Sequence, residues 1–581
     1  MQERPAEISE PNATDAVGAD PAHAALRRPG FLRFTEPHVL SNDFGPLSPL
    51  TPFASFPVHN GGVAVLTEDS SAHPTPHVFV TRGDLTHVAC DAWMVSTDRT
   101  LNVLPHWTDG NDALQRAIAE FDDRRFRYGK VHASAPASWT ARTPLPIFTA
   151  VPIFGFTETA EFVDIIDDFA RVAVEALASL EVTTKRPLPL LAMPIIGSGG
   201  GGGAGVIGDL IRTVIEAAER AAARHHVDFV IVVRDASQIG LAQRIRRGDR
   251  QERWSELSPA VRDAAQDLAH DCLAGNVVPF LGAGISMSAG APSWDSLVTE
   301  LSSAVTGQLT DDEKTSLAKK NVLDQAEILK NLYDSPESFN AAVAKLVNRQ
   351  SYGLAPTLIA NLPLEQAITL NYDELFEIAS NDAGQPCAVI PGDEAPDAHR
   401  WLLKMHGNVA DESTIVLTRT DYLGFDANRN VLAALVKASL VTKRLVFIGF
   451  GLGDDHFHQI LHDVRQMSPE SIARRALALT LSDDSLERKA WKNKITLQPM
   501  TPEGTDIAMA GRVLEIFLDY LLMLSTDSRE YLLDPAYASQ LTPSERRLKD
   551  IISQLHALRD DADDPSIDAA VEAIRGFGQS G

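Results

Sequence analysis

Four short stretches of the sequence place glycine, asparagine, aspartate or histidine directly after an apolar run. They are NVVPFLGAGIS at 276–286, AITLNYD at 367–373, WLLKMHG at 401–407 and RLVFIGFGLGDD at 444–455. A glycine turn between a strand and a helix can present backbone N–H groups to a phosphate. An imidazole can accept a proton near neutral pH, and an asparagine amide can hydrogen-bond a hydroxyl or a water. The four stretches together predict a site that binds a phosphate-bearing ligand and moves a proton.

Each stretch also has a purely structural interpretation. The glycines can form a tight corner, Asn371 or Asp373 can cap the next helix, and His406 can be a buried, hydrogen-bonded residue. Four strand ends of this kind are hard to explain as separate accidents. Since open α/β sheets bind their ligands at the carboxyl ends of the strands, we expect these side chains to meet at one edge of a sheet.

The elements that must position these residues follow from the alternation of strands and helices, which predicts two three-layer α/β domains. In the first, strands are expected at Val63–Leu66 and in HVFVTR, DAWMVST, PIFTAVPIF, LLAMPII and DFVIVVRD, and a helix in EFVDIIDDFARVAVEALASL. The expected boundaries are a flexible tail at 1–50, a domain at 55–245, a linker at 246–258, a second domain at 259–524 and a helical C-terminal tail at 525–581.

Composition excludes several classes of protein. The 581 residues carry a formal net charge of -26, which is unsuited to binding nucleic acid. The 3 cysteines are far apart, so they predict a reducing cytoplasm and neither a disulfide framework nor a four-cysteine zinc site. We expect no membrane association, because the longest apolar run, VLEIFLDYLLML, contains Glu515 and Asp519 and is shorter than the roughly 18 residues needed to cross a bilayer.

The order GAGIS with AGAPSW, then TLNYD, KMHG and IGFGLGD resembles the sirtuin-like NAD-consuming domain, over roughly Pro259 to Leu524. The resemblance implies a Rossmann-type domain with a mainly parallel sheet and NAD as the substrate. It also implies roles for individual residues. The pyrophosphate and adenosine side would be lined by Gly282, Ala283, Gly284 and Ser286. The nicotinamide ribose would be held by Asn371 and Asp373, the base would be His406, and the adenosine ribose would be covered by Gly449 and Gly451.

Two departures from the family pattern matter. Protein-deacylating sirtuins carry a zinc module of four cysteines, which this chain cannot supply, so we expect no metal. The chain is therefore similar to the zinc-free bacterial NAD hydrolases of antiphage defence, including the effector of the Thoeris system. Gly451 stands where the family often has a hydroxyl residue, so contacts there would come from the backbone.

The residues fit this chemistry without the family name. Breaking the glycosidic bond of NAD+ gives an oxocarbenium-like sugar and neutral nicotinamide. Asn371 can hydrogen-bond a ribose hydroxyl or the attacking water, and His406 can take a proton from either. General-base assistance is worth typically 100- to 10,000-fold, so His406→Ala should abolish useful turnover.

The first domain contains VTRGDLTHVACDAWMVSTD and LLAMPIIGSGGGGGAGVIGDL, which resemble the macro domain, an ADP-ribose-binding fold. By this resemblance the adenine amino group would be received by Asp84, and the distal phosphates would be held by Gly197, Ser198, Gly199 and Gly200. Val95 and Asp98 replace the two asparagines of the family's hydrolases, which favours binding over hydrolysis. The alternative is that the glycines form only a flexible low-complexity loop.

Together these features predict an NAD+ hydrolase that produces nicotinamide and ADP-ribose and depletes NAD during phage infection. The macro-like domain would sense a nucleotide such as an ADP-ribose derivative, with 246–258 as the hinge. We expect a homo-oligomer, because assembly is one physical means of holding such an activity off. The alternatives are an NAD-dependent ADP-ribosyl or acyl-group transferase and a non-catalytic NAD or ADP-ribose binding module.

Overall fold

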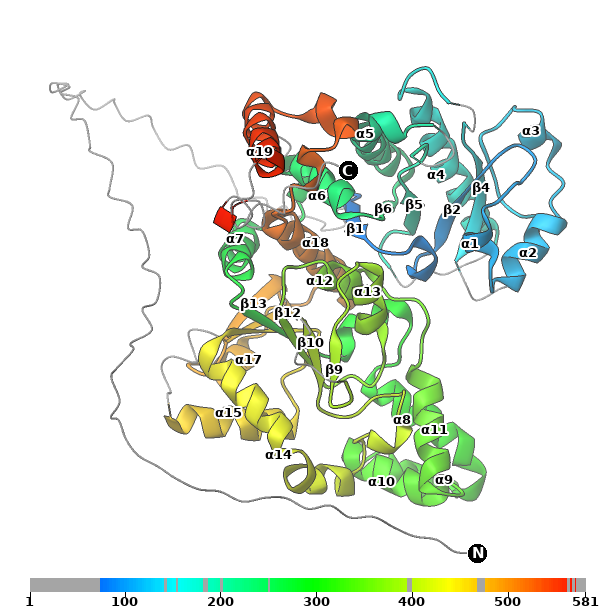
Figure 1. Cartoon of the computed structure of the whole chain (residues 1–581). Helices are drawn as coiled ribbons and strands as arrows, with labels where there is room; N and C mark the ends of the chain where they lie inside the picture. The colour runs from blue at the N-terminus through cyan, green and yellow to red at the C-terminus, as the bar shows by residue number, and fades with distance from the viewer. Residues whose placement is uncertain are drawn as a thin grey trace, which may run out of the picture. The chain divides into compact units, whose positions relative to one another are not determined.

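The computed structural model describes residues 74–139, 144–152, 155–180, 186–198, 202–248, 251–393, 400–467, 476–561, 565–566 and 570. These residues belong to one compact unit that contains two α/β domains, an N-terminal and a C-terminal one (Figure 1). The strand expected at Val63–Leu66 lies outside the described residues. Within them, no helix combines the length and the apolar character needed to cross a bilayer.

A six-stranded sheet forms the centre of the N-terminal domain. Its strands are β1 (Val78–Arg82), β2 (Ala92–Thr97), β3 (Ala133–Ser134), β4 (Leu145–Ala150), β5 (Leu190–Pro194) and β6 (Asp228–Val233). They lie in the order β1-β6-β5-β2-β4-β3, in which β3 runs antiparallel to β4 and the other pairs are parallel. Helices cover both faces, which is why its parallel strands consist of nearly continuous apolar residues.

The helices of this domain fall into two layers. One face of the sheet packs against α4 (Glu161–Ser179), α5 (Ile207–His225) and α6 (Ala236–Arg247). The other face packs against the short helices α1 (Pro105–Thr108), α2 (Asp112–Ala119) and α3 (Arg124–Arg127). The arrangement confirms the predicted three-layer architecture.

The C-terminal domain is built on a seven-stranded sheet whose pairs are all parallel. Its strands are β7 (Val277–Leu281), β8 (Gln366–Thr369), β9 (Ala388–Ile390), β10 (Trp401–Lys404), β11 (Arg444–Ile448), β12 (Leu477–Ser482) and β13 (Thr496–Thr501). The order is β13-β12-β11-β7-β8-β10-β9. The chain leaves β7 toward β8 but leaves β11 in the opposite direction toward β12. The topological switch point therefore lies between β7 and β11.

Helices cover both faces of this sheet too. One layer consists of α7 (Pro259–Leu273), α12 (Leu354–Ala360), α13 (Leu375–Asp382) and α18 (Ile507–Ser525). The opposite layer consists of α14 (Arg419–Thr442) and α15 (Asp455–Met467). A helical insertion between β7 and β8 has its own core and comprises α8 (Trp294–Val305), α9 (Asp311–Leu317), α10 (Val322–Leu332) and α11 (Pro336–Val347).

The two domains share one hydrophobic core. Phe79 and Val230 of the N-terminal sheet belong to the same buried cluster as Ala367 of the C-terminal sheet and Phe517 of α18. The helix α18 arises from the apolar run VLEIFLDYLLML and is buried along most of its length. Since a shared core resists separation of its halves, the two domains are joined as one body.

Three described residues of the segment 246–258, which we expected to be a linker and a hinge, are packed into this junction. Arg246, Trp254 and Leu257 are 2%, 4% and 1% exposed. The arginine-rich sequence suggests a surface, but its first arginine is an interior residue. Hinge motion at this segment would have to break these buried contacts.

Buried ion pairs connect α18 to the N-terminal domain. Arg246 binds both carboxylate oxygens of Asp519, with 2.8 Å between Nη1 and Oδ1, and His77 Nε2 lies 2.8 Å from Asp519 Oδ2. Arg512 Nε donates to Asp228 Oδ2 at 2.7 Å. Each charge lost here would leave its partner unpaired in the interior, which costs several kcal/mol, on the order of 3–5.

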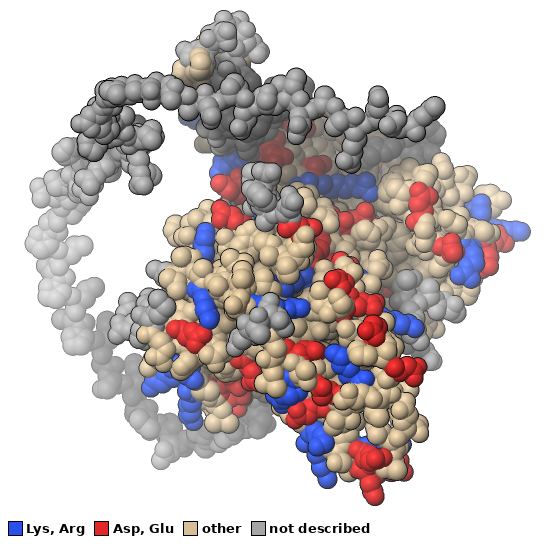
Figure 2. All heavy atoms as spheres, turned by 60° about the horizontal axis from the view of Figure 1, so that its bottom comes forward, with Lys and Arg blue, Asp and Glu red and all other residues tan. Residues whose placement is uncertain are grey.

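The segment after α18 packs back on the N-terminal domain. It contains two 3-10 turns, η8 (Glu530–Leu532) and η9 (Pro535–Gln540), and the helix α19 (Pro543–Asp561). Tyr531 and Tyr537 are buried in the same cluster as α5 and α6. On the face shown in Figure 2, acidic and basic side chains are interspersed.

Candidate active site

The four stretches singled out in the sequence meet at one edge of the C-terminal sheet. They follow β11, β7, β8 and β10, which are consecutive neighbours in the parallel sheet. Their carboxyl ends therefore lie side by side, flanking the switch point. This is the edge at which open α/β sheets bind ligands.

The glycines after β7 and β11 let two loops touch through their backbones. Gly284 N donates to Gly449 O at 2.9 Å, and Gly282 N donates to Ile448 O at 3.0 Å. Gly449 has a φ of +63°, and a Cβ on it would lie 2.6 Å from Ile285 N. These glycines are required for the close packing of the two loops.

This packing changes the expected use of the β7 loop. The amides of Gly284, Ile285 and Ser286 donate to backbone carbonyls, and the loop continues through two 3-10 turns. The helix α8 begins only at Trp294, where Ser293 is its cap. The helix start therefore does not follow the glycine turn directly, contrary to the expectation from the sequence. Ala283 is exposed.

Asn371, Ser286 and Asp373 form one hydrogen-bonded network across β7 and β8. Asn371 Nδ2 donates to Gly282 O at 3.1 Å and approaches Ser286 Oγ at 3.4 Å, and Ser286 Oγ donates to Asp373 Oδ2 at 3.0 Å. A backbone carbonyl can only accept, so the Nδ2 end of the amide must face Gly282. The amide oxygen Oδ1 is then the atom that can receive a hydrogen bond from a hydroxyl or a water.

Lys404 is hydrogen-bonded to the backbone of this network, although the sequence analysis assigned it no role. The side chain is 1% exposed, and Nζ donates to Asp373 O and to Glu377 Oε1, both at 2.6 Å. Burial raises the pKa of the Asp373 carboxyl, and the Lys404 ammonium opposes that shift. Burial likewise raises the pKa of Glu377 against the same ammonium. Lys404 therefore fixes the backbone that carries Asn371 and Asp373.

His406 is a buried, neutral imidazole at the end of β10. It is 1% exposed and lies edge-on to Tyr422 and Phe425. Burial lowers the pKa of His406 to about 4, since a cation there would lose its hydration. At physiological pH the ring is therefore neutral, and one ring nitrogen has a lone pair that can accept a proton. No hydrogen bond joins His406 to Asn371 in the described structure, and the two residues follow different strands, β10 and β8.

His456 sets the orientation of His406. His456 Nε2 lies 3.0 Å from the backbone oxygen of Tyr422, so a neutral His456 carries its hydrogen there. Its Nδ1 then accepts from His406 Nε2 at 3.1 Å. This leaves Nδ1 as the basic nitrogen of His406.

Tyr422 and Asp454 complete the surroundings of this pair. The His456 ring is stacked with Tyr422 and with Phe425, and the Tyr422 hydroxyl donates to Asp454 Oδ2 at 2.8 Å. The sequence stretch that ends in GDDHF contains Asp454 and His456, and this proximity to the glycine motif was the available signal. Tyr422 comes from α14 and carried no signal.

Metal binding at this point has one candidate set. The ligand atoms of His406, Asp454 and His456 lie within 4.8 Å of one another. The imidazoles already hydrogen-bond each other, and the carboxylate already accepts from Tyr422. We therefore interpret the set as a hydrogen-bonded pair with an acidic neighbour, and the absence of a metal stays a prediction.

A large cavity opens beside the switch point. Its volume is about 1450 Å³, above the ~300–1000 Å³ of sites for drug-sized ligands. On the C-terminal domain it is lined by Gly284, Ile285, Met287, Gly449, Phe450 and Gly451, among others. Thus Gly284, Gly449 and Gly451 of the sequence-predicted nucleotide residues lie in its wall, whereas Asn371, Asp373 and His406 do not.

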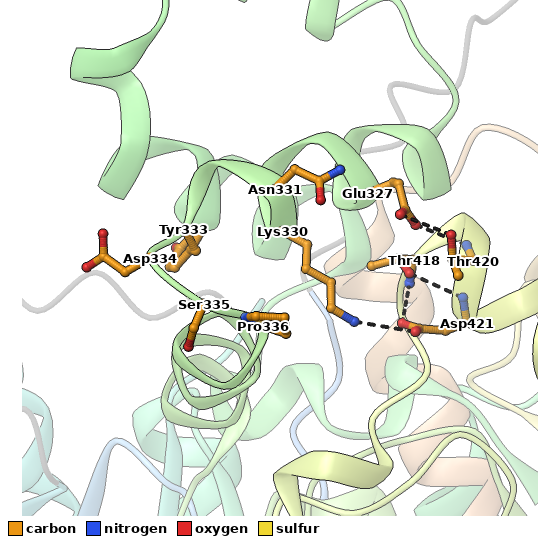
Figure 3. A pocket seen from close by; sticks show the side chains of 10 residues that line it. All are labelled: Glu327, Lys330, Asn331, Tyr333, Asp334, Ser335, Pro336, Thr418, Thr420 and Asp421. Atoms are coloured by element: carbon orange, nitrogen blue, oxygen red, sulfur yellow. Dashed lines mark hydrogen bonds and ion pairs between the residues drawn. The ribbon is translucent and has the colours of Figure 1, made fainter.

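A second, smaller hollow of about 300 Å³ lies between α10 and the start of α14 (Figure 3). Lys330 Nζ points to Asp421 Oδ1 at 3.4 Å, and Glu327 accepts from Thr420 N and Oγ1 at 3.0 Å each. Three of its charged side chains, those of Lys330, Asp421 and Glu327, thus already have partners across the joint. We interpret it as a joint between the helical insertion and the sheet domain.

Three of the residues predicted to bind a nucleotide in the N-terminal domain, Asp84, Gly197 and Ser198, follow the carboxyl ends of β1 and β5. Asp84 Oδ1 accepts from Thr86 N at 2.9 Å and from Thr86 Oγ1 at 2.7 Å, so it caps the 3-10 turn after β1. Burial acts to raise the pKa of Asp84, but the Thr86 hydrogen bonds outweigh it and lower the pKa overall. Gly197 follows β5 with a φ of +81°, and Ser198 Oγ donates to Ile195 O at 2.7 Å. Gly199 and Gly200 lie outside the described residues.

The loop that carries Asp84 also contacts the C-terminal domain. Asp84 N donates to the Tyr352 hydroxyl at 3.2 Å. His87 Nδ1 lies 2.7 Å from Oδ2 of Asp382, the last residue of α13. This bond raises the pKa of His87, although burial opposes it. The predicted sensing loop is therefore joined to the helix that follows Asp373.

Comparison with known proteins finds a family match over strands that carry part of this site. Residues 365–500 match the family model of the SIR2-like domain, which includes Asn371, His406 and Gly449. The chain is 27% identical over 223 residues to "Defense-associated sirtuin 2" of Bacillus subtilis, covering 37% of this chain and 22% of that protein. It is 28% identical over 242 residues to "NAD(+) hydrolase ThsA" of Enterococcus faecium, covering 38% of this chain and 48% of that protein. The chain thus spans less than half the length of these relatives.

A solved structure is similar in another part of the fold. The "Oceanobacillus iheyensis macrodomain with MES bound" is a neighbour with a TM-score of 0.24 and 12% sequence identity, covering 30% of this chain and 92% of that one. The assignment of the site depends on the geometry of the C-terminal sheet and on the family match, and not on this neighbour. The chain therefore carries a SIR2-like domain in its C-terminal half, matched over residues 365–500.

Proposed function

We propose that the protein hydrolyses NAD+ to nicotinamide and ADP-ribose and acts as an antiphage-defence effector by depleting NAD. One observation carries the proposal: a buried, neutral His406 and the oriented Asn371 amide lie at the carboxyl ends of the adjacent strands β10 and β8. The names of the relatives, a defence sirtuin and NAD(+) hydrolases, support both parts.

The ribose would be held by the network on β8. The Asn371 amide oxygen can accept from a ribose hydroxyl or from the attacking water, because its nitrogen is bound to Gly282 O. Asp373 cannot reorient freely, since Ser286 and the backbone amide of Leu375 both donate to it. The network is therefore preorganised, which avoids the cost of ordering it during the reaction.

The reaction breaks the bond between C1′ of the ribose and the nicotinamide nitrogen. The bonding electron pair leaves with nicotinamide, which becomes neutral, and a water oxygen forms the new bond to C1′. The water loses one proton, which His406 Nδ1 can accept. Asn371 is the group that would orient the water, and His456 keeps Nδ1 of His406 unprotonated until then.

The test is NAD+ consumption by the purified full chain, with products separated by chromatography. We expect nicotinamide and ADP-ribose to form without an acceptor protein or an acylated peptide. His406→Ala and Asn371→Ala should each lower kcat by at least about 100-fold, the lower range of general-base assistance. The matched control is His270→Ala, at an exposed position of α7, which should keep wild-type turnover.

Two results would contradict this assignment. NAD+ consumed only when an acceptor is supplied would indicate the ADP-ribosyl or acyl-group transferase. NAD+ bound but never consumed would indicate the non-catalytic binding module. In cells, the wild type should lower phage plating and intracellular NAD+ together, and His406→Ala should do neither.

We further propose that the N-terminal domain senses an ADP-ribose-type nucleotide and that the chain acts as a homo-oligomer. Support for sensing comes from His87, because a ligand at Asp84 would displace a loop bonded to the end of α13. Added ADP-ribose should raise the NAD+ turnover of the wild type but should not raise that of Asp84→Ala or His87→Ala. Light scattering of the purified protein tests assembly, and a monomer at every nucleotide concentration would exclude it.

A further inference from the structure

The large cavity is bounded by both domains. On its N-terminal side it is lined by Cys90, Asp91, Trp139, Leu145, Leu180 and Arg186, and α18 adds residues from its first turns. On the other side are the carboxyl ends of β7, β11 and β12. A ligand at the switch point would therefore touch the N-terminal domain as well.

The cavity adjoins the catalytic network through one loop. Gly284, Ile285 and Met287 line the cavity, while Ser286 between them is 1% exposed and bonds to Asp373. A dinucleotide whose nicotinamide ribose lies at Asn371 would thus extend past this loop. Its pyrophosphate and adenosine would enter the cavity.

The charges in the cavity distinguish one arginine from the others. Arg186 Nη1 lies 2.7 Å from Glu515 Oε2, and Arg512 Nε lies 2.7 Å from Asp228 Oδ2. Arg349 instead donates only to carbonyl oxygens in the described structure, to Gly290 O at 3.3 and 3.1 Å and to Asn348 O at 3.0 Å. Carbonyl oxygens do not neutralise its charge. A pyrophosphate would pair with this guanidinium through charge-assisted hydrogen bonds.

We propose that the substrate site is shared between the domains: Arg349 binds the pyrophosphate, and the N-terminal domain packs on the adenosine around Trp139. The inference rests on the proposed function and adds the binding residues that determine dinucleotide recognition. Trp139 is a partly buried residue of the cavity wall, and an indole is the kind of aromatic group on which nucleobases stack. The N-terminal domain thus completes the substrate site in addition to carrying the Asp84 loop.

The test measures KM and kcat for NAD+ in Arg349→Gln, Arg349→Lys and Trp139→Ala of the full chain. We expect Arg349→Gln to raise KM by at least about 10-fold, as for loss of a charge-assisted hydrogen bond, with kcat within about 3-fold. Arg349→Lys should recover part of the loss, and Trp139→Ala should raise KM without changing kcat. The matched control is Arg220→Gln, at an exposed position of α5.

ADP-ribose distinguishes a substrate subsite from a separate regulatory site in the same cavity. As a competitive inhibitor it should weaken in Arg349→Gln by the same factor as NAD+. If ADP-ribose activates turnover and Arg349→Gln abolishes that activation while KM is unchanged, the cavity is a regulatory site and the inference is wrong. Unchanged KM and unchanged ADP-ribose binding would also overturn it.

Calorimetric binding of ADP-ribose separates this inference from the function it rests on. If the wild type never hydrolyses NAD+ but binds ADP-ribose, and Arg349→Gln loses the part of that binding that Asp84→Ala retains, the proposed function fails and the cavity assignment stands. If hydrolysis is present and Arg349→Gln behaves like Arg220→Gln, only the cavity assignment fails. Thermal unfolding of each variant shows whether a loss reflects misfolding, and Arg349→Lys keeps the test valid if Arg349→Gln does not fold.

Discussion

His406 combines a basic nitrogen with surroundings that reject its protonated form. Its burial beside Tyr422 and Phe425 lowers its pKa from the ordinary 6.5 to about 4. A general base near its operating pH is the usual optimum, so this imidazole is a weaker base than an exposed one. What it gains is a fixed tautomer, because His456 accepts from its Nε2. The surroundings of His406 therefore fix the tautomer of its ring but make the ring a weaker base.

The lowered pKa of His406 predicts a pH-dependent stability. Between pH 6.5 and about 4 an unfolded His406 binds a proton that the folded one does not, so the free energy of unfolding should fall as the pH falls. We expect His406→Gln to lose less stability than the wild type between about pH 7 and about pH 5, measured by denaturant unfolding. His270→Gln, at the exposed position, should follow the wild type. Parallel curves for wild type and His406→Gln would show that the imidazole is not buried in solution.

His456 is predicted to act as a positioning residue. His456→Ala removes the acceptor for His406 Nε2. It should lower kcat about 10-fold, which is less than the roughly 100-fold loss expected when the general base itself is removed. KM should change little. His456→Asn should recover part of kcat, because an amide can accept from His406 and donate to the Tyr422 carbonyl. His458→Ala, on the exposed side of the same helix, is the control. Equal losses in KM and kcat for His456→Ala and His456→Asn would indicate a folding defect instead.

The residues found from the sequence are those whose type and position after a strand reveal them. Asn371, Asp373 and His406 end apolar runs, and such runs predict strands whose carboxyl ends meet. Lys404 and Tyr422 could not be found this way, because one looks like an ordinary strand residue and the other belongs to a distant helix. Their roles depend on packing between segments, which local periodicity does not report.

At the next level, the loops after β7 and β11 act as one unit because glycines let their backbones touch. Gly449→Ala places a side chain at a φ of +63°, and its Cβ would lie 2.6 Å from Ile285 N. The left-handed conformation alone costs about 1–2 kcal/mol, and the close contact adds to it. We expect at least that loss in the free energy of unfolding. Gly307→Ala, with no heavy atom within 4 Å of its Cβ, should change it by less than about 0.5 kcal/mol.

The helix α18 is predicted to depend on its buried ion pairs. Asp519→Asn would leave Arg246 without a carboxylate in the interior, where breaking such a pair costs about 3–5 kcal/mol. Chemical denaturation should report a loss of that size. The control is Glu175→Gln, which breaks the exposed pair with Arg171 and should cost no more than about 0.5 kcal/mol. Similar losses in both variants would contradict the burial of Asp519.

The same helix shows where sequence reasoning ends. The apolar run with Glu515 and Asp519 forms the helix Ile507–Ser525. The run does not predict that Asp519 meets Arg246, because these residues are 273 positions apart. For the same reason the arginine-rich segment 246–258 suggested a linker. Its arginine is interior only because α18 brings the counter-charge.

At the level of the whole protein, the shared core predicts that the SIR2-like domain is not independent. A fragment of residues 259–581 would lack Arg246, His77 and Asp228, leaving Asp519 and Arg512 exposed together with the apolar face of α18. We expect this fragment to be aggregated, or to unfold at a much lower temperature than the full chain. Scanning calorimetry and gel filtration of both proteins test it. A monomeric fragment with the Tm of the full chain would show that the domains fold separately.

The fold class was predictable for both halves, since alternating strands and helices give three-layer α/β domains whatever their partners. The macro-like and SIR2-like motifs also lie where strands end, as expected. Their joining through one core was not predictable, because an apolar helix face gives no sign of which sheet it covers. The domain boundaries and the residue roles stay predictions until the variants are measured.

The position of α18 in the chain also bears on how the protein is made. Residues 507–525 leave the ribosome after both sheets have been synthesised, yet the interior charges of the N-terminal domain, at Asp228 and Arg246, await partners from this helix. A nascent or prematurely terminated chain therefore lacks the piece that closes its interior. The interior of the N-terminal domain is therefore completed only after α18 has been synthesised.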